Sequence, residues 1–390
     1  MITLAKKTLQ DVLKKQGSIS NKFDQHTKKI ARIFEQCHKK NLSNKDSGKR
    51  LSDGSEVTYF TAFQSVRKKI YNQFGIVDPM KIKKEHTNWL LKEEMANLSA
   101  NHIRKTEQAI HFINSFACES GVYKKELDMI DHEDMLEYFK EEGIIRSSRH
   151  SSRYKADDNE CEDVLEEIYD YCDGKNSEYG DIARVQYLTG GRGIETIGLK
   201  PSDIDLESNK VYFDDAKGGL NNVVWCSHWT ENDKIFMKNL VENAKDDRLF
   251  RIKGKDGNYL SDEAIKIRVN NIAKRAANRI GVGKGTGKDF RSHSFRGGFG
   301  FKRTKIYCSL SSADIDKAIE QKIEEQPRLK QRFNNFKKHI LDKVKEPNNR
   351  EIQDYEKVQW LVSVDLNHSR QDVVRFYVPT DYIKDLLAKR

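Results

Sequence analysis

The 390-residue chain has no long apolar run, and no two of its cysteines stand close together. No stretch approaches the roughly 20 apolar residues that a membrane-spanning helix needs. The first seven residues, Met1 to Lys7, contain neither a long apolar segment nor a small-residue cleavage site, so we expect no signal peptide. These absences argue against a membrane protein.

The six cysteines form no CxxC pair, and no Cys/His spacing in the chain suits zinc: Cys37, Cys118, Cys161, Cys172, Cys226 and Cys308. We therefore expect reduced thiols in a cytoplasm, with no structural metal and no cofactor.

The composition is polar and basic, with 37% hydrophobic and 33% charged residues and a formal net charge of +10. A basic balance favours a polyanionic partner, because neutralising phosphates releases counterions. The first fifty residues hold thirteen Lys or Arg against four Asp or Glu, with apolar residues at roughly helical spacing. This pattern predicts a helical arm that faces DNA. The alternative is an ordinary solvated helical face.

Helical periodicity over 57–78, 83–98 and 99–120 predicts an all-helical module in residues 1–130. Residues 131–173 then become acidic, with fifteen acidic side chains against five basic ones. Within them, 146–153 has no apolar periodicity and indicates a linker. We therefore predict two domains, 1–155 and 156–390.

The second half has a mixed pattern. A helix is expected at 179–189, before Gly190 and Gly191, and extended segments at 203–206, 210–214 and 223–226, with a turn-rich hairpin tip at 217–222. Further helices are expected to start at Thr230, with Asp233 in a capping box, and at Ser261, with Gly281 as its stop. Two helices separated near Pro327 are expected in 312–345, and two more at 351–363 and 370–377. The predicted fold is mostly α with a small β-sheet.

Four short motifs in this half follow one another along the chain. They are Thr189-Gly-Gly-Arg192-Gly-Ile-Glu195, Lys217 at the hairpin tip, His293-Ser-Phe-Arg296, and Leu366-Asn-His368-Ser369, with Tyr377 nine residues after His368. Each motif is weak by itself, so their weight lies in the shared order and in the structural context of each.

These residue types suit the cleavage of a DNA phosphodiester, which needs a nucleophile, charge on the non-bridging oxygens and a proton for the leaving oxygen. Without a metal, cationic side chains must stabilise the transition state. Arg192 and Arg296 suit this role because a guanidinium stays charged and donates two parallel hydrogen bonds to phosphate. His293 and His368 can donate hydrogen bonds or move protons near neutral pH. Tyr377 would form a phosphotyrosine that conserves the bond energy.

In these motifs the sequence resembles the tyrosine recombinases, also called phage-type integrases. Members of that family carry an arginine in a TG-x-R-x-x-E turn, a lysine on a β-hairpin, an H-x-x-R box, a GH(S) box and a tyrosine shortly after it. The resemblance implies that Arg192 and Arg296 bind the scissile phosphate, Lys217 is the general acid, His293 assists proton transfer, His368 stabilises the transition state, Tyr377 attacks and Glu195 supports the first arginine. It clearly covers about 180–310 and 358–378.

The resemblance also implies an organisation and partners. Residues 1–155 would be an arm and a core-binding, SAM-like DNA-binding domain, and 156–390 an α+β catalytic domain. The enzyme would need neither metal nor ATP, and it would act on double-stranded DNA as a homo-tetramer on synapsed sites. We expect it to integrate or excise a mobile element such as a phage, with possible accessory DNA-bending or directionality factors, in association with a bacterial nucleoid.

The sequence departs from the family pattern in two places. Asn367 stands where the family usually has Gly, although Asn tolerates unusual backbone angles. Seventy-two positions separate Arg296 from His368, which indicates a helical insertion near 305–350. The insertion would be a DNA contact, a protein contact, a regulatory element or an ordinary packed helix pair. The tail after Tyr377 would dock on a neighbouring protomer or fold back on its own domain.

Competing assignments are weaker. Tyr382 and Tyr307 compete with Tyr377 as the nucleophile, and Lys210 competes with Lys217 as the acid. The glycine-rich segment 281–288 looks like a phosphate loop, but Asp289 stands where such loops need Ser or Thr and a helix precedes it, so we reject nucleotide hydrolysis.

Two other functions stay open at this point. A type IB topoisomerase or a telomere resolvase would use the same chemistry, and an inactive DNA-binding relative would keep the fold alone.

Overall fold

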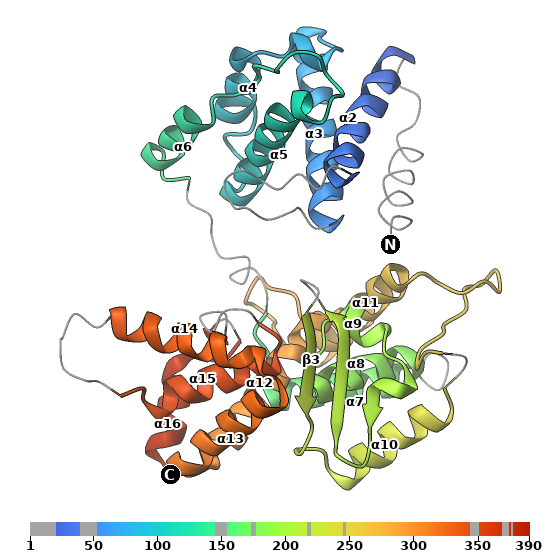
Figure 1. The fold of residues 1–390 in the computed structure, drawn as a ribbon. Helices are drawn as coiled ribbons and strands as arrows, with labels where there is room; N and C mark the ends of the chain where they lie inside the picture. Colours follow the sequence, from blue (N-terminus) through green and yellow to red (C-terminus); the bar gives the residue numbers. More distant parts are fainter. Residues whose placement is uncertain are drawn as a thin grey trace. The chain divides into compact units, whose positions relative to one another are not determined.

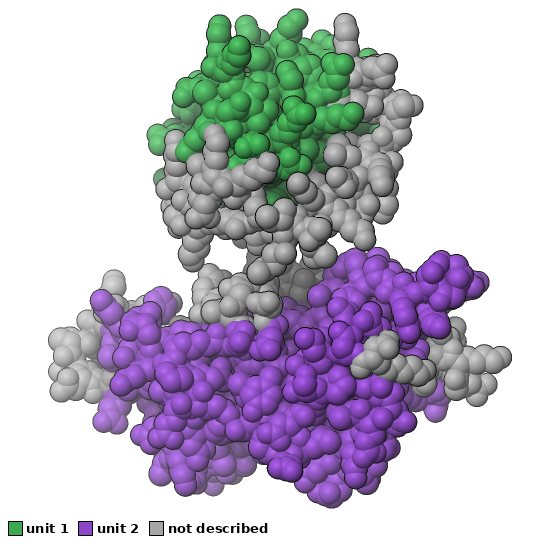
Figure 2. Space-filling model, turned by 45° about the vertical axis from the view of Figure 1, so that its right-hand side comes forward, with its two compact units in different colours: residues 1–148 green, residues 149–390 purple. Residues whose placement is uncertain are grey.

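The computed structural model describes residues 21–39, 53–144, 154–172, 177–216, 220–244, 247–343, 351–368, 374–375 and 377–390. The chain divides into two compact units, residues 1–148 and residues 149–390 (Figures 1 and 2). The predicted linker, 146–153, and the first twenty residues of the predicted basic arm lie outside the described residues.

Unit 1 is all-helical in its described part. Helices α2, α3 and α5 pack against one another around an apolar core (Figure 1). On α5, the predicted apolar face (Ile103, Ile110, Ile113 and Phe116) is buried. The elements are α2 (Asn21–Lys39), α3 (Asp53–Phe74), η1 (Pro79–Lys81), α4 (Lys84–Trp89), the π-helical turn η2 (Leu90–Glu94), α5 (Ala100–Glu119) and α6 (His132–Glu141).

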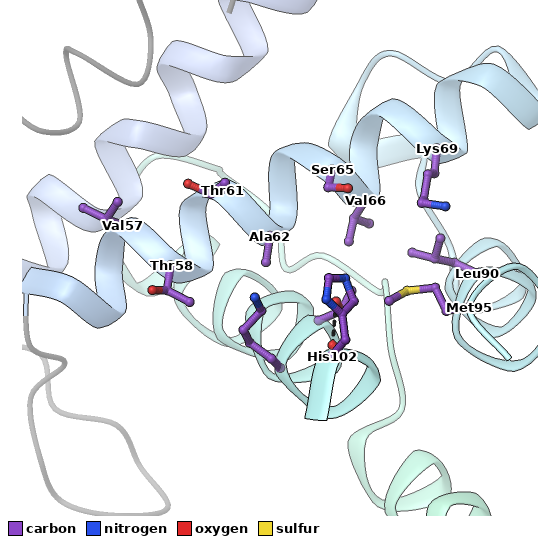
Figure 3. Close-up of a pocket in the computed structure, with 12 residues that line it drawn as sticks. Val57, Thr58, Thr61, Ala62, Ser65, Val66, Lys69, Leu90, Met95 and His102 are labelled. Carbon is purple, nitrogen blue, oxygen red and sulfur yellow. Dashed lines mark hydrogen bonds between the residues drawn. The ribbon is translucent and has the colours of Figure 1, made fainter. Parts of the chain in front are cut away.

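A cavity of about 420 Å³ lies in unit 1, lined by α3, α5 and the segment around η2 (Figure 3). Its polar lining includes Lys69, His102 and Lys105. Burial, together with the charges of Lys105 and Lys69, lowers the pKa of His102. None of the predicted site residues lines this cavity.

Unit 2 combines helices with a three-stranded antiparallel sheet in the order β1-β2-β3, which confirms the predicted fold class. The elements are α7 (Asp158–Cys172), α8 (Ser177–Thr189), α9 (Gly193–Ile197), η4 (Pro201–Asp203), β1 (Ile204–Asp205), β2 (Lys210–Ala216), β3 (Leu220–Trp225), α10 (Glu231–Glu242), α11 (Asp262–Ile280), α12 (Ser292–Ser309), α13 (Ser312–Glu325), α14 (Arg328–Lys343), α15 (Asp354–Asp365) and α16 (Thr380–Ala388).

Several helix ends follow the predicted local signals. Thr230 Oγ1 accepts a hydrogen bond from Asp233 N, which closes the expected capping box of α10. Ser261 Oγ accepts from Ala264 N at the start of α11, and Gly281 ends that helix with φ +80°. The structure differs at 370–377, where Val374 and Arg375 form a 3-10 turn and residues 369–373 and 376 lie outside the described part.

Helix α12 lies at the centre of unit 2, in contact with α7, α8, α11, α15 and α16. Its glycines permit this close packing. A Cβ on Gly298 would lie 2.5 Å from Cys161 Sγ on α7, so only glycine fits there. The N-terminal turn of α12 carries His293 and Arg296, and its central position brings both to the ends of neighbouring helices.

Within the described segments, every helix is too short or too polar to cross a lipid bilayer.

Candidate active site

The predicted site residues come from four segments that meet in unit 2. Arg192 caps α9, and His293 and Arg296 occupy the first turns of α12. His368 follows the end of α15, and Tyr377 precedes α16. The structure therefore brings these five residues together, although up to 185 positions separate them along the chain.

The end of α15 forms a Schellman turn that presents His368. The N–H of His368 donates to Ser363 O at 2.9 Å, and that of Asn367 donates to Val364 O at 2.8 Å. Asn367 adopts φ +45°, in the left-handed region that such a turn requires and that Gly or Asn adopts at low cost. The replacement of the family's Gly by Asn is therefore compatible with the expected turn.

Arg296 is almost completely buried, with 1% of its surface exposed. Its Nη1 donates to Gly190 O and its Nη2 donates to Leu366 O. Nη2 also lies 3.3 Å from His368 Nε2. Burial lowers the pKa of this guanidinium, because removal of water disfavours the charged form.

Arg192 is held by Glu195, one turn further along α9. Glu195 Oε2 accepts from Arg192 N at 2.9 Å, and Oε1 accepts from its Nη1 at 2.6 Å. Burial favours a raised pKa for Glu195, but the charge and hydrogen bonds of Arg192 outweigh it and the pKa lies below the usual value. Arg192 Nη2 donates to Asn367 O at 3.1 Å, so the first arginine also contacts the turn before His368.

Tyr377 is surrounded by the predicted histidines. Its Oη lies 2.9 Å from His293 Nε2, and its ring centroid lies 5.3 Å from that of His368. The guanidinium carbon of Arg296 lies 6.0 Å from the same ring centroid. Tyr377 is 5% exposed, so this tyrosine is buried in unit 2.

The two tyrosines that compete with Tyr377 have other contacts. Tyr382 packs on Phe301, with ring centroids 5.1 Å apart. Tyr307 is buried, and its hydroxyl donates to Asp365 Oδ2 at 2.8 Å. Of the three candidates, Tyr377 is the one that contacts His293.

The two lysine candidates differ in what the structure shows of them. Lys217 lies outside the described residues. Lys210 forms an ion pair with Glu325 of α13, 2.5 Å apart, and its hydrogen bond to that carboxylate raises its pKa. Lys210 therefore joins the sheet to α13 rather than standing free for catalysis.

The predicted insertion is packed into unit 2. On α13, Ile315, Ile319 and Lys322 are buried, and on α14, Leu329 and Phe336 are buried. The ring of Phe333 contacts Trp360 of α15, with centroids 4.9 Å apart. The segment therefore forms a packed helix pair, and the DNA-contact, protein-contact and regulatory roles considered for it stay predictions.

Helix α16 of the C-terminal tail contacts α12 and α15 of its own unit, and its Ile383 is fully buried. Of the two alternatives for the tail, the structure shows the one in which it folds back on its own domain.

The sequence motifs missed two groups of residues around the site. Arg332 of α14 donates to His368 O. Asp365, the last residue of α15, is fully buried between Arg303 and Lys322, at 2.7 and 2.6 Å. The buried charges come from helices far apart in sequence, so spacing carries no signal for them. For Arg332, a signal in the sequence was its position as a cation on the amphipathic α14.

No protein-family model matches the chain, and no curated protein matches it in sequence. Solved structures do match in fold. The XerH site-specific recombinase bound to palindromic difH substrate, in a post-cleavage complex, aligns over 100% of this chain and 94% of its own, with a TM-score of 0.50 and 15% identity. Its pre-cleavage complex with difH aligns over 96% and 90%, with a TM-score of 0.47 and 15% identity.

A dimer of lambda integrase (75–356) bound to a COC' core site aligns over 70% of this chain and 87% of that fragment, with a TM-score of 0.47 and 12% identity. At these identities the likeness is one of fold. The fold expected from the resemblance to tyrosine recombinases is confirmed by the match to XerH.

Proposed function

We propose that this chain is a site-specific DNA recombinase of the tyrosine recombinase type, which cuts and rejoins DNA through a 3′-phosphotyrosine on Tyr377. The observation that carries the proposal is that His293, His368 and Arg296 lie around the Tyr377 phenol, while Arg192 is bonded to the turn that presents His368. One buried and one partly buried guanidinium near a buried tyrosine suit a phosphate that must be neutralised while it is attacked. The fold shared with XerH supports the same reading.

The proposed cleavage step transfers the scissile phosphoryl group from the 5′ oxygen of the DNA to Tyr377. Tyr377 Oη attacks the phosphorus while its proton passes to His293 Nε2, 2.9 Å away. The bond from phosphorus to the 5′ oxygen breaks, and Lys217, as the resemblance implies, gives that oxygen a proton. Arg192 and Arg296 neutralise the non-bridging oxygens, as metal ions do in other phosphoryl-transfer enzymes.

Rejoining reverses these steps. A 5′ hydroxyl attacks the phosphotyrosine, the bond to Tyr377 breaks, and one phosphodiester replaces the one that was cut. Because the covalent intermediate keeps the bond energy, resealing needs no ATP.

We further propose double-stranded DNA as the substrate, a homo-tetramer on two synapsed sites as the active assembly, and integration or excision of a mobile element as the role. The net charge of +10 supports a DNA partner through counterion release.

Covalent trapping tests the proposal. The full-length chain is incubated with a pool of labelled duplexes of random sequence that carry a nick at varied positions, so that the cut strand end diffuses away. We expect an SDS-stable protein–DNA band with the wild type and none with Tyr377→Phe. Tyr382→Phe is the matched control and keeps the band.

The outcomes separate the candidate functions. A wild type that binds the pool but forms no adduct refutes the enzymatic proposal and leaves a DNA-binding protein. An adduct with Tyr377→Phe shows that another residue attacks. Relaxation of a supercoiled plasmid that lacks the selected site favours a type IB topoisomerase over a site-specific enzyme.

A further inference from the structure

The turn that presents His368 is held by three arginines, one on each of three consecutive carbonyl groups. Leu366 O accepts from Arg296, and Asn367 O accepts from Arg192. His368 O accepts from Arg332. Leu366 is the C-cap of α15, so its carbonyl has no partner within the helix and lies at the negative end of the helix dipole, where a guanidinium satisfies it well.

Two of these arginines belong to the proposed phosphate site, and the third comes from α14. Arg332 lies between Leu329 and Phe336, both of which are buried. With Phe333 packed on Trp360 at 4.9 Å between ring centroids, α14 has a fixed position against α15. The guanidinium of Arg332 is therefore delivered from a packed helix rather than from a loop.

The charge of Arg332 is only partly screened. Its side chain is half-buried, and burial together with the charge of Arg328 lowers its pKa. Within the part of the chain that the structure describes, no carboxylate forms an ion pair with Arg332. Partial burial of a cation without an anionic partner costs folding free energy. Because Arg332 is bonded to the backbone of a site residue, we expect this cost to be offset by support of that residue or of an anion beside it.

We propose that Arg332 is a positioning residue of the active site, which holds the His368 turn in register with Arg296 and Tyr377. This inference rests on the proposed function. His368 Nε2 lies 3.3 Å from Arg296 Nη2, and its ring centroid lies 5.3 Å from that of Tyr377. Of the three carbonyl bonds that hold the turn, the one from Arg332 is made to His368 itself, and Arg332→Ala removes it. Displacement of a site residue from its productive position lowers the catalytic rate strongly.

The experiment separates chemistry from DNA binding. Duplexes recovered from the trapping pool are used at saturating concentration, and the single-turnover rate of adduct formation is measured for Arg332→Ala beside DNA affinity. We expect the rate to fall by about 100-fold, as for the loss of one preorganised hydrogen-bond donor, with affinity unchanged. Gln331→Ala is the matched control, because Gln331 is exposed and its amide donates to the exposed Asn335 at 2.9 Å.

Chemical rescue tests the positioning role further. Millimolar guanidinium ions added to Arg332→Ala should restore part of the rate and leave Gln331→Ala unchanged. Arg332→Lys keeps the charge with a different geometry, and it should recover only part of the rate. If Arg332→Ala does not fold, a rate for Arg332→Lys equal to wild type overturns the inference and a reduced rate supports it.

Two results would overturn the inference. One is wild-type cleavage by Arg332→Ala, and the other is a loss confined to DNA affinity. Either result leaves the proposed function intact as long as the wild type forms its adduct. A wild type without an adduct instead refutes the proposed function.

Discussion

Replacement of Asp365 should destabilise unit 2 far more than replacement of Lys322, although the two residues form one ion pair. Asp365 and Lys322 are fully buried, and Arg303 is 2% exposed. Asp365 Oδ1 pairs with Lys322 at 2.6 Å, and Oδ2 pairs with Arg303 at 2.7 Å and accepts from Tyr307. One buried carboxylate therefore compensates two buried cations.

This charge balance sets the order of the two effects. Asp365→Asn leaves Arg303 and Lys322 buried without an anion, and breaking a buried pair in this way costs about 3–5 kcal/mol. Lys322→Met leaves the neutral pair of Arg303 and Asp365, with one carboxylate oxygen short of a partner. An unsatisfied buried acceptor costs about 1–3 kcal/mol. The substitution also replaces the ammonium that lies 4.7 Å from the Trp225 ring centroid with a thioether, which can itself contact an aromatic ring. We expect a difference of about 2 kcal/mol between the variants on this basis.

Denaturant unfolding followed by tryptophan fluorescence measures this difference in the full-length chain. Three of the four tryptophans, Trp225, Trp229 and Trp360, lie in unit 2, and Trp89 lies in unit 1. The signal therefore reports mainly on the unit that holds the cluster. The midpoint should fall most for Asp365→Asn. A larger loss for Lys322→Met would refute the charge balance derived from the structure.

The pH dependence supplies a second check. Burial favours a raised pKa for Asp365, but Arg303 and Lys322 outweigh it and hold the pKa below its usual value. A carboxylate with a lowered folded pKa contributes stability above its unfolded pKa and loses it as the pH falls through the folded one. Wild-type stability should show this acid loss, and Asp365→Asn should lack it.

Two further predictions concern neighbouring residues. Burial, with the charge of Arg303, lowers the pKa of His228 from 6.5 to about 3. Between these values the unfolded chain takes up a proton that the folded one does not, so stability should fall as the pH drops from about 6.5 toward 3. His228→Gln, whose amide can still donate to Leu188 O, should flatten that part of the curve in urea titrations, and an unchanged slope would contradict the assignment. At Asn367, with φ +45°, replacement by Ala should lower stability by about 1–2 kcal/mol, whereas Gly should not. Thermal unfolding of the two variants checks this, and equal melting temperatures would count against backbone strain as the reason for Asn.

Local signals in the sequence were sufficient for much of the fold. The capping box of α10 and the Ser261 start and Gly281 stop of α11 were predictable because each depends on contacts within about four residues. The mostly helical fold with a small sheet followed from apolar periodicity and turn residues in the same way. The end of α15 with its Asn367 turn belongs to this class, since Asn is one of the few residues that adopt the left-handed region readily.

The contacts of the segment 305–350 could not be predicted from local signals. Its length and its amphipathic helices were visible in the sequence, and a DNA-facing insertion was one of the expected roles. The placement of Lys322 against Asp365 and of Arg332 against His368 joins positions 43 and 36 apart in the chain. Neither contact has a periodicity or a spacing rule behind it, so only the packed fold reveals them.

The sequence by itself determined which residues have the chemistry for phosphate cleavage and the order in which they occur, because residue type and local turn context are written in neighbouring positions. The tertiary structure decided that Arg192, Arg296 and Arg332 meet on three consecutive carbonyls and that His293 reaches Tyr377. Those contacts depend on how α9, α12, α14 and α15 pack, which is a property of the whole apolar core rather than of any one segment.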